Sequence, residues 1–165
     1  MSFAYVRRTL AALLLSAVLL VTGCSTTTAP PASSSSSAPS ETVSTQVLPG
    51  SEFNKFFPSA SGEFDRVYTQ EKEGFAEAKL KQNGNDVAML AISDTASTPA
   101  AVQKYQQSRK SIAGYPAVEV GSTQTAILVA ERFQVKAISR DSSFTGTDRE
   151  AWLQKFDLNG LARLQ

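Results

Sequence analysis

Four charged residues lie at the ends of predicted strands, where they could take part in binding or catalysis. Asp94 follows the apolar run 87–92. Its carboxylate has the chemistry of a general acid or base, but an aspartate in this position more often caps the following turn. Arg132, Arg140 and Asp141 flank the last predicted strand. A guanidinium group there could hold a carboxylate or a phosphate, whereas charges at strand ends more often form simple surface ion pairs.

The loop 142–147, with the sequence SSFTGT, follows this strand and contributes an aromatic side chain. We expect Phe144 to be exposed and, with Arg132 and Arg140, to form the binding surface of the domain. We assign no catalytic residue, because the sequence contains no phosphate-binding loop, no dinucleotide fingerprint and no paired-carboxylate signature.

The amino-acid composition narrows the chemistry that the chain can perform. It contains no histidine and only one cysteine, which excludes Ser-His-Asp and Cys-His triads and zinc sites of the Cys/His type. Its 16 basic and 15 acidic residues are scattered, whereas a nucleic-acid-binding protein needs clustered basic side chains. We therefore expect no metal, no cofactor and no nucleic-acid partner.

The single cysteine, Cys24, lies just after an apolar segment. Arg7 and Arg8 precede the run 10–21, in which Ser16 is the only polar residue. A basic start, a short apolar run and small residues after it are typical of a secretory signal peptide. The run of about a dozen residues is too short to cross a hydrocarbon core of roughly 30 Å as a helix.

The residues Val21, Thr22, Gly23 and Cys24 resemble the lipobox of bacterial lipoproteins. In that family the cysteine thiol receives a diacylglyceryl group, a signal peptidase cuts before the cysteine, and the new amino group is usually acylated. The resemblance implies that residues 1–23 are a signal peptide, that cleavage separates Gly23 from Cys24, and that Cys24 carries the lipid. An ordinary signal peptide followed by a chance cysteine is the alternative.

The resemblance also implies a location. Two or more acyl chains give stable membrane anchoring, whereas one chain gives only marginal binding. In bacteria with two membranes, Ser25 resembles the residue that directs lipoproteins to the outer membrane. We therefore expect a protein of the cell envelope, anchored by lipid, and facing the periplasm from the outer membrane if the organism has two membranes.

A polar segment separates Cys24 from the rest of the chain. Residues 25–46 are almost entirely Ser, Thr, Ala and Pro, with Glu41 and Val43 among the few exceptions. Such a segment buries too little apolar surface to fold, and about 22 flexible residues would span roughly 25–30 Å on average. We expect 24–47 to be the lipidated cysteine with a disordered tether, and 48–165 to be a single domain.

Hydrophobic patterns predict the first elements of that domain. Residues 50–57 favour a helix capped by Ser51, with three phenylalanines on a common face. Alternation around Asn83-Gly84 predicts a hairpin, although the composition of 70–81 also suits a helix. Residues 97–113 favour a helix that ends at Gly114.

The remaining sequence predicts three strands between 115 and 139 and a closing helix. That helix begins at a capping box, Thr147 to Glu150, and carries Trp152 and Phe156 on its buried face. The predicted order is α-β-β-α-β-β-β-α. This order indicates an α+β domain in which a small antiparallel sheet of about five strands is packed by helices.

These observations lead to one preferred function and two alternatives. We expect a membrane-anchored lipoprotein with a non-enzymatic accessory or protein-binding domain, which works with an envelope protein. A lipoprotein that binds a small ligand in the cleft between sheet and helices is the alternative, and an enzyme is a third, less favoured one.

The lipobox leads to the first testable prediction. Mass spectrometry of the membrane fraction is expected to find a mature protein that begins at Cys24 and carries acyl chains there. A mature terminus at another residue, or an unmodified thiol, would contradict the prediction.

Overall fold

The computed structural model describes residues 46–164. The predicted signal peptide, the Gly23–Cys24 cleavage site, the lipidated Cys24 and the tether up to residue 45 lie outside this part of the chain. Among residues 46–164, no helix is long and apolar enough to cross a bilayer.

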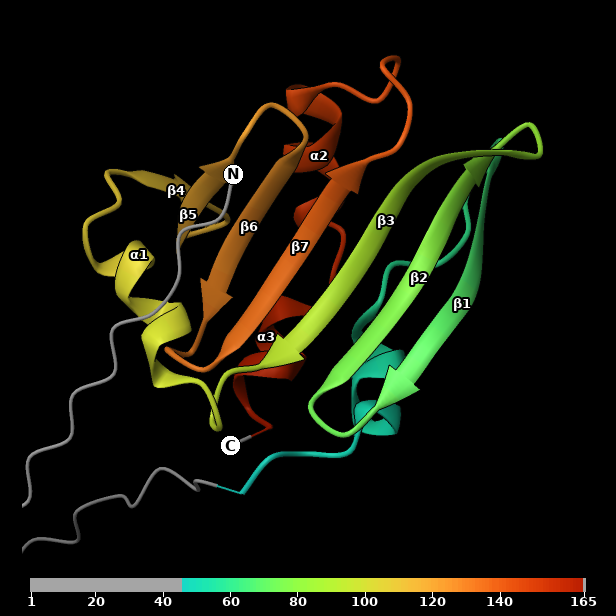
Figure 1. The fold of residues 1–165 in the computed structure, drawn as a ribbon. Helices are drawn as coiled ribbons and strands as arrows, with labels where there is room; N and C mark the ends of the chain where they lie inside the picture. The colour runs from blue at the N-terminus through green and yellow to red at the C-terminus, as the bar shows by residue number, and fades with distance from the viewer. Residues whose placement is uncertain (1–45, 165) are drawn as a thin grey trace, which may run out of the picture. The chain divides into compact units, whose positions relative to one another are not determined.

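The described residues form one antiparallel sheet of seven strands in the order β1-β2-β3-β7-β6-β5-β4 (Figure 1). The strands are β1 (Phe64–Lys72), β2 (Phe75–Gln82), β3 (Asn85–Asp94), β4 (Lys110–Ile112), β5 (Tyr115–Val120), β6 (Gln124–Val129) and β7 (Phe133–Ser139). The helical elements are short: η1 (Gly50–Phe56), η2 (Pro99–Val102), α1 (Gln103–Gln106), α2 (Gly146–Leu153) and α3 (Leu158–Ala162). The predicted α+β class with an antiparallel sheet is confirmed, but sheet dominates.

A tight two-residue turn explains why β2 and β3 pair. Asn83 and Gly84 both have positive φ, 50° and 82°, between β2 and β3. Two successive residues with positive φ produce the turn whose twist matches that of paired strands. The predicted hairpin at Asn83-Gly84 is confirmed, and the alternative helix over 70–81 is excluded because these residues lie in β1, β2 and the turn between them.

The prediction of a long helix over 97–113 was wrong. Only η2 and α1 are helical there, and Lys110–Ile112 forms β4. The Ser108 hydroxyl donates a hydrogen bond to the carbonyl of Ala117 in β5, and accepts one from the Lys110 amide at 3.2 Å. Gly114 (φ 84°) is therefore a hairpin turn residue and not a helix stop.

The predicted strand count of about five and the predicted order of elements were also wrong. Besides β4, the prediction omitted β1, whose sequence FDRVYTQEK carries charges on both faces. A strand with no buried face lacks the apolar alternation that identifies strands in a sequence. β1 is held by pairing with β2 along its whole length.

Two predicted helix caps moved. Helix α2 starts two residues earlier than predicted, because Thr145 is its N-cap. The Thr145 hydroxyl accepts a hydrogen bond from the Asp148 amide at 3.4 Å, and the Asp148 carboxylate accepts one from the Thr145 amide at 2.8 Å. This reciprocal pair has the geometry of a capping box with aspartate at its third position. Ser51 does not cap η1, which follows Pro49 and has no side-chain cap.

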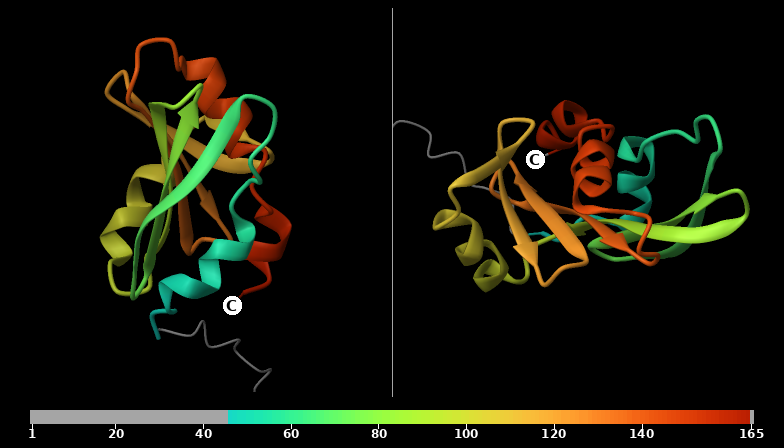
Figure 2. Two further views of the ribbon diagram at one scale, coloured as in Figure 1. Left: turned by 90° about the vertical axis from the view of Figure 1, so that its right-hand side faces the viewer. Right: turned by 90° about the horizontal axis from the view of Figure 1, so that it is seen from above.

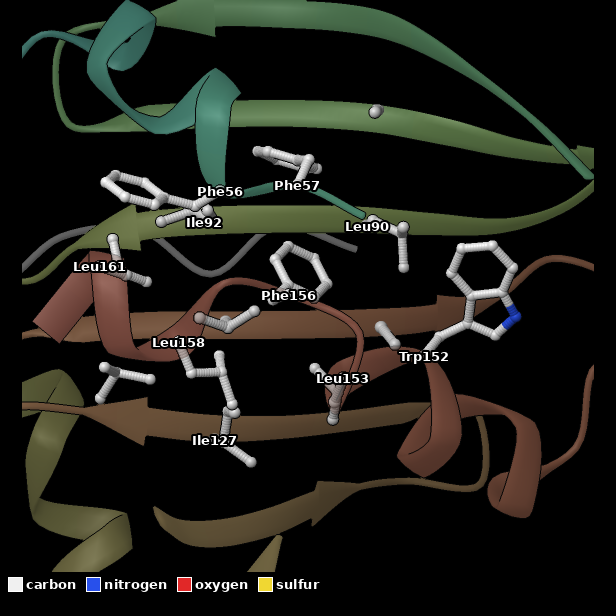
Figure 3. Close-up of a cluster of buried hydrophobic side chains, with 14 of the residues drawn as sticks. Phe56, Phe57, Leu90, Ile92, Ile127, Trp152, Leu153, Phe156, Leu158 and Leu161 are labelled. Carbon is white, nitrogen blue, oxygen red and sulfur yellow. The ribbon is translucent and has the colours of Figure 1, made fainter. Parts of the chain in front are cut away.

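Elements η1, α2 and α3 pack on the same face of the sheet and build the main core (Figure 2). Aromatic residues from distant parts of the sequence meet there. The ring centroids of Phe57 and Phe156 are 5.2 Å apart (Figure 3), and those of Phe64 and Trp152 are 5.1 Å apart. The predicted burial of Trp152 and Phe156 is confirmed, with each 4 % exposed, but Phe156 lies beyond the end of α2 and not on the helix as predicted.

A smaller cluster lies on the opposite face of the sheet, beneath η2 and α1 (Figure 2). It consists of Tyr105, Ala126 and Leu128, with Val102 and Val118 at its margin. The Tyr105 hydroxyl accepts a hydrogen bond from Gln134 Nε2 at 2.7 Å, which satisfies two buried polar groups.

The core packing predicts the effect of truncating Phe156. Replacing Phe156 by Ala should lower the free energy of unfolding by roughly 3–5 kcal/mol, because a buried ring is lost and a cavity remains. Denaturant unfolding followed by the fluorescence of Trp152 measures this change. The matched control is Asn159→Ala, on an exposed position of α3, which should change stability by less than about 0.5 kcal/mol. Equal effects of the two substitutions would contradict the packing.

Candidate functional site

The three residues predicted to form one binding surface do not lie on one surface. Arg132 directly precedes β7 and Arg140 directly follows it, so the two lie at opposite ends of a seven-residue strand. At about 3.3 Å per residue, the eight steps from Arg132 to Arg140 separate them by roughly 26 Å. Arg132 is moreover only 3 % exposed, and Phe144 only 4 %. Arg140 is the one member of the three that is exposed.

Arg132 is occupied by a buried ion pair with Asp94. Arg132 Nε donates to Asp94 Oδ1 at 3.0 Å and Nη2 donates to Oδ2 at 2.8 Å, a bidentate geometry. The Asp94 side chain has no exposed surface. Two-point contact of this kind fixes orientation as well as supplying energy. Arg132 is therefore a structural residue, which corrects its predicted role in binding.

The same ion pair fastens the start of the domain. Asp94 Oδ2 accepts a hydrogen bond from the Leu48 amide at 3.0 Å, and Arg132 Nη2 donates to the Gln46 carbonyl at 2.7 Å. Asp94 Oδ1 also accepts from the Ala96 amide at 3.0 Å, so Asp94 caps the turn after β3 as the sequence favoured. We call Asp94, Arg132 and residues 46–48 the entry clamp.

The electrostatics of the entry clamp keep Asp94 ionised. Burial by itself would raise the pKa of the Asp94 carboxyl. The hydrogen bonds from Arg132 and from the amides of Ala96 and Leu48 outweigh burial and hold this pKa below its usual value. A carboxylate with four such donors is a poor proton acceptor near neutral pH, which argues against a role for Asp94 as a general base.

A hollow of about 470 Å³ lies at the opposite end of the sheet. It is formed where the β5–β6 turn, the end of β7 and the loop before α2 meet, at the top of Figure 1. We call it the distal hollow. Hydroxyl groups and arginines dominate its lining, which consists of Ser122, Thr123, Ser139, Arg140, Asp141, Ser142, Phe144, Thr145, Gly146 and Arg149.

Arg149 is the buried one of the two arginines that line the distal hollow. Its side chain is 4 % exposed. Nε donates to Thr125 Oγ1 at 2.9 Å, Nη1 donates to Ser139 Oγ at 2.8 Å, and Nη2 lies 3.4 Å from Glu119 Oε2. These contacts to β5, β6 and β7 hold the guanidinium plane at the wall of the hollow. Arg149 was not among the residues predicted from the sequence.

One signal in the sequence could have pointed to Arg149. It lies in the first turn and a half of α2, where the positive end of the helix dipole disfavours a cation. An arginine in that position needs specific partners, and here they are two hydroxyl groups and a carboxylate. The sequence does not reveal these partners, because they lie on three different strands, 10 to 30 residues before Arg149 along the chain.

Arg140 and Phe144 do come together in the distal hollow, but in different roles from those predicted. The Arg140 amide donates to the Val87 carbonyl at 2.8 Å, while its side chain is exposed and makes no ion pair within residues 46–164. Phe144 belongs to the main core, and its carbonyl accepts a hydrogen bond from the Ser139 hydroxyl at 2.5 Å. The ring anchors the loop that carries Arg140.

The donors that line the distal hollow are suited to binding an anion. Guanidinium groups and hydroxyls are donors that match carboxylate or phosphate oxygens. The one carboxylate of its lining, Asp141, is already engaged by the hydroxyl and amide of Ser143, which lower its pKa. In the described part of the chain, no cluster of His, Cys, Asp and Glu could hold a metal ion.

The fold and both sites define an α+β domain with an antiparallel sheet, a buried entry clamp and a distal hollow that contains two arginines. No protein-family model matches the chain, and searches of curated proteins and of solved structures found no match.

The entry clamp leads to a prediction about stability and pH. Replacing Asp94 by Asn leaves Arg132 buried without its counter-charge and should lower the free energy of unfolding at pH 7 by roughly 3–5 kcal/mol. Because the pKa of Asp94 is depressed by folding, its contribution is complete above the unfolded-state pKa of about 4 and disappears as the pH falls through the lower folded-state value. Denaturant unfolding at several pH values measures both effects.

The wild type and the Asp94→Asn variant should therefore converge in stability as the solution is acidified. The control is Asp86→Asn, which removes the partner of Lys79 and Lys81 in an accessible pair and should have a much smaller effect at pH 7. A constant difference between wild type and Asp94→Asn down to pH values well below 4 would contradict the ionised pair.

Proposed function

We propose that this chain is a non-enzymatic lipoprotein of the cell envelope. Its lipid on Cys24 holds it to a membrane, and its domain binds a carboxylate-bearing segment of an envelope protein in the distal hollow. The single observation that carries the proposal is the position of this hollow, which lies at the end of the sheet remote from the residue where the tether enters.

The two ends of the sheet support this division of roles. Gln46 and Leu48 are held at the end where β3 finishes and β7 begins. The distal hollow lies where β7 finishes (Figure 1). A tether of about 22 residues that enters at the first end would leave the other end free to face a partner.

The chemistry of the distal hollow supports an acidic partner. Arg149 is fixed by three neighbours, so little conformational entropy is lost when it contacts a ligand. Arg140 is exposed and has no competing ion pair among the described residues. An exposed cation steers an acidic partner towards the site, and the buried cation then gives a directed contact.

A second hollow supports the alternative of a small ligand. It measures about 270 Å³ and lies between α1 and the sheet, lined by Val102, Tyr105, Gln106, Pro116, Leu128 and Glu131. Burial raises the pKa of Tyr105 to about 12, so its phenol stays neutral in this mainly apolar setting. Such a hollow suits a small apolar ligand, and a change at Arg140 should leave its binding unaffected.

Photocrosslinking in the native envelope tests the proposed function. A photoreactive residue at Ser142, beside the distal hollow, should give a discrete adduct with a protein, and the same residue at Asn159, at the other end of the domain, should not. Arg140→Glu should remove the adduct by reversing the charge that attracts the partner. The matched control Arg163→Glu, on an exposed position at the C-terminal end, should retain it.

Mass spectrometry of the adduct then identifies the contacted segment, which should contain Asp or Glu or a free terminal carboxylate. An adduct that survives Arg140→Glu, or equal adducts from Ser142 and Asn159, would refute binding through the distal hollow.

A further inference from the structure

The two edges of the sheet differ greatly in length. At one edge, β4 has only three residues. At the other, β1 has nine, and from Val67 to Lys72 all of them are exposed. Within residues 46–164 no strand pairs with the outer edge of β1, although Phe64 near its start exchanges two backbone hydrogen bonds of 3.2 Å with Ser61. A free edge of this length is a template for pairing with another strand.

Charged residues often protect such an edge from pairing, but the charges of β1 are arranged in complementary order. Near its start β1 has an acid and then a base, Asp65 and Arg66, and at its end an acid and then a base, Glu71 and Lys72. If two copies of β1 run antiparallel about an axis between Tyr68 and Thr69, Asp65 lies opposite Lys72 of the second copy. Arg66 then lies opposite its Glu71.

A bulge in β1 places these charges on matching faces. Residues seven apart in a regular strand point to opposite faces. The register of β1 against β2 shifts between Tyr68 and Gln70. The extra residue of this bulge brings residues seven apart, such as Asp65 and Lys72, back to the same face of the strand. Asp65 lies opposite Lys81 and Lys72 opposite Phe75.

Side chains alternate between the two faces along β2, and this alternation shows on which face of the sheet each charged residue of β1 lies. Lys81 and Phe75 are an even number of residues apart, so they lie on one face of β2, and Asp65 and Lys72 share that face. The other pair behaves in the same way: Arg66 lies opposite Leu80 and Glu71 opposite Ala76, both of which point into the core. The two members of each complementary pair therefore lie on the same face of an extended sheet: Asp65 and Lys72 on one face, and Arg66 and Glu71 on the other.

Two of the most exposed large apolar side chains of the described residues also lie on β1. Val67 is 46 % and Tyr68 41 % exposed, and both lie beside the axis of the antiparallel arrangement. Val120 on β5 is the third large apolar side chain with comparable exposure in this part of the chain. Pairing through β1 would cover two of the three.

We propose that two copies of this chain associate through their β1 strands, antiparallel, to form one continuous sheet. The partner is a second copy because the charge order of β1 is complementary to itself. The axis between Tyr68 and Thr69 sets the register, which places Val67 opposite Gln70 of the other copy. The proposal is independent of the distal hollow, which lies at the end of β7 and contains no residue of β1.

Cysteine crosslinking of the full-length chain in its own envelope tests both the association and the register. The sequence contains a single cysteine, so the introduced thiols are the only others present. The double variant Val67→Cys/Gln70→Cys should form a species of twice the mass on a non-reducing gel, because the thiol at position 67 of one copy lies opposite the thiol at position 70 of the other. Each single variant should not, since identical residues lie too far apart for a disulfide.

Charge reversal supplies the second arm of the test. In the double-cysteine background, Asp65→Lys should reduce the crosslinked fraction several-fold, because it places two positive charges opposite each other at the Lys72 position of the second copy. Adding Lys72→Asp should restore the crosslinked fraction. The control Val120→Cys, on an equally exposed side chain, measures crosslinking by random collision. Thermal unfolding of each variant verifies that it is folded.

Three outcomes would overturn the proposal: no crosslink in the double-cysteine variant, equal crosslinking by the single variants or Val120→Cys, or no recovery with Lys72→Asp. Arg140→Glu should leave the crosslink unchanged. This separates a failure of β1 pairing from a failure of binding in the distal hollow.

Discussion

The bidentate pair between Asp94 and Arg132 is the contact on which the arrangement of the chain depends most. It joins the end of β3 to the turn before β7, two strands that are neighbours in the sheet but 38 residues apart in sequence. The amide of Thr95 and its hydroxyl both donate to the Arg132 carbonyl, at 3.0 and 2.6 Å, and strengthen the same junction. The pairing of β3 with β7 brings the hairpin half of the domain against the half formed by β4 to β7. A buried pair of this kind adds specificity of register more surely than it adds net stability.

Features that depend on residues close together in the sequence could be predicted, whereas features that depend on contacts between distant segments could not. The Asn83-Gly84 hairpin was predictable because the turn and the alternation are local. The burial of Trp152 and Phe156 was predictable for the same reason. β1 was not, because its stability comes from pairing with β2 and its side chains are mostly in solvent. The stretch that becomes α1 and β4 has helical composition, but the contact of Ser108 with β5 decides its conformation.

The candidate site shows the same limit more strongly. Arg132 and Arg140 were both recognisable as cations that flank one strand, but the sequence does not show that Arg132 is buried against Asp94, 38 residues away. Arg149 was missed because its partners, Thr125, Ser139 and Glu119, lie on three different strands. The sequence shows where each arginine lies along the chain. Whether an arginine is held in a buried ion pair, like Arg132, or lines a hollow, like Arg149, depends on contacts with other strands.

The hydrogen bonds at Gln46 and Leu48 also have a mechanical consequence. A pull along the chain from residues before Gln46 reaches the Arg132 contact first, then the Leu48 amide on Asp94, and then the Leu48 carbonyl, which accepts from the Gly74 amide at 2.7 Å. These bonds join the first described residues to β3 and to the turns beside β2 and β7, so tension spreads into the sheet before it reaches η1. Tension applied from the N-terminal side would therefore be shared among several backbone and side-chain hydrogen bonds of the sheet.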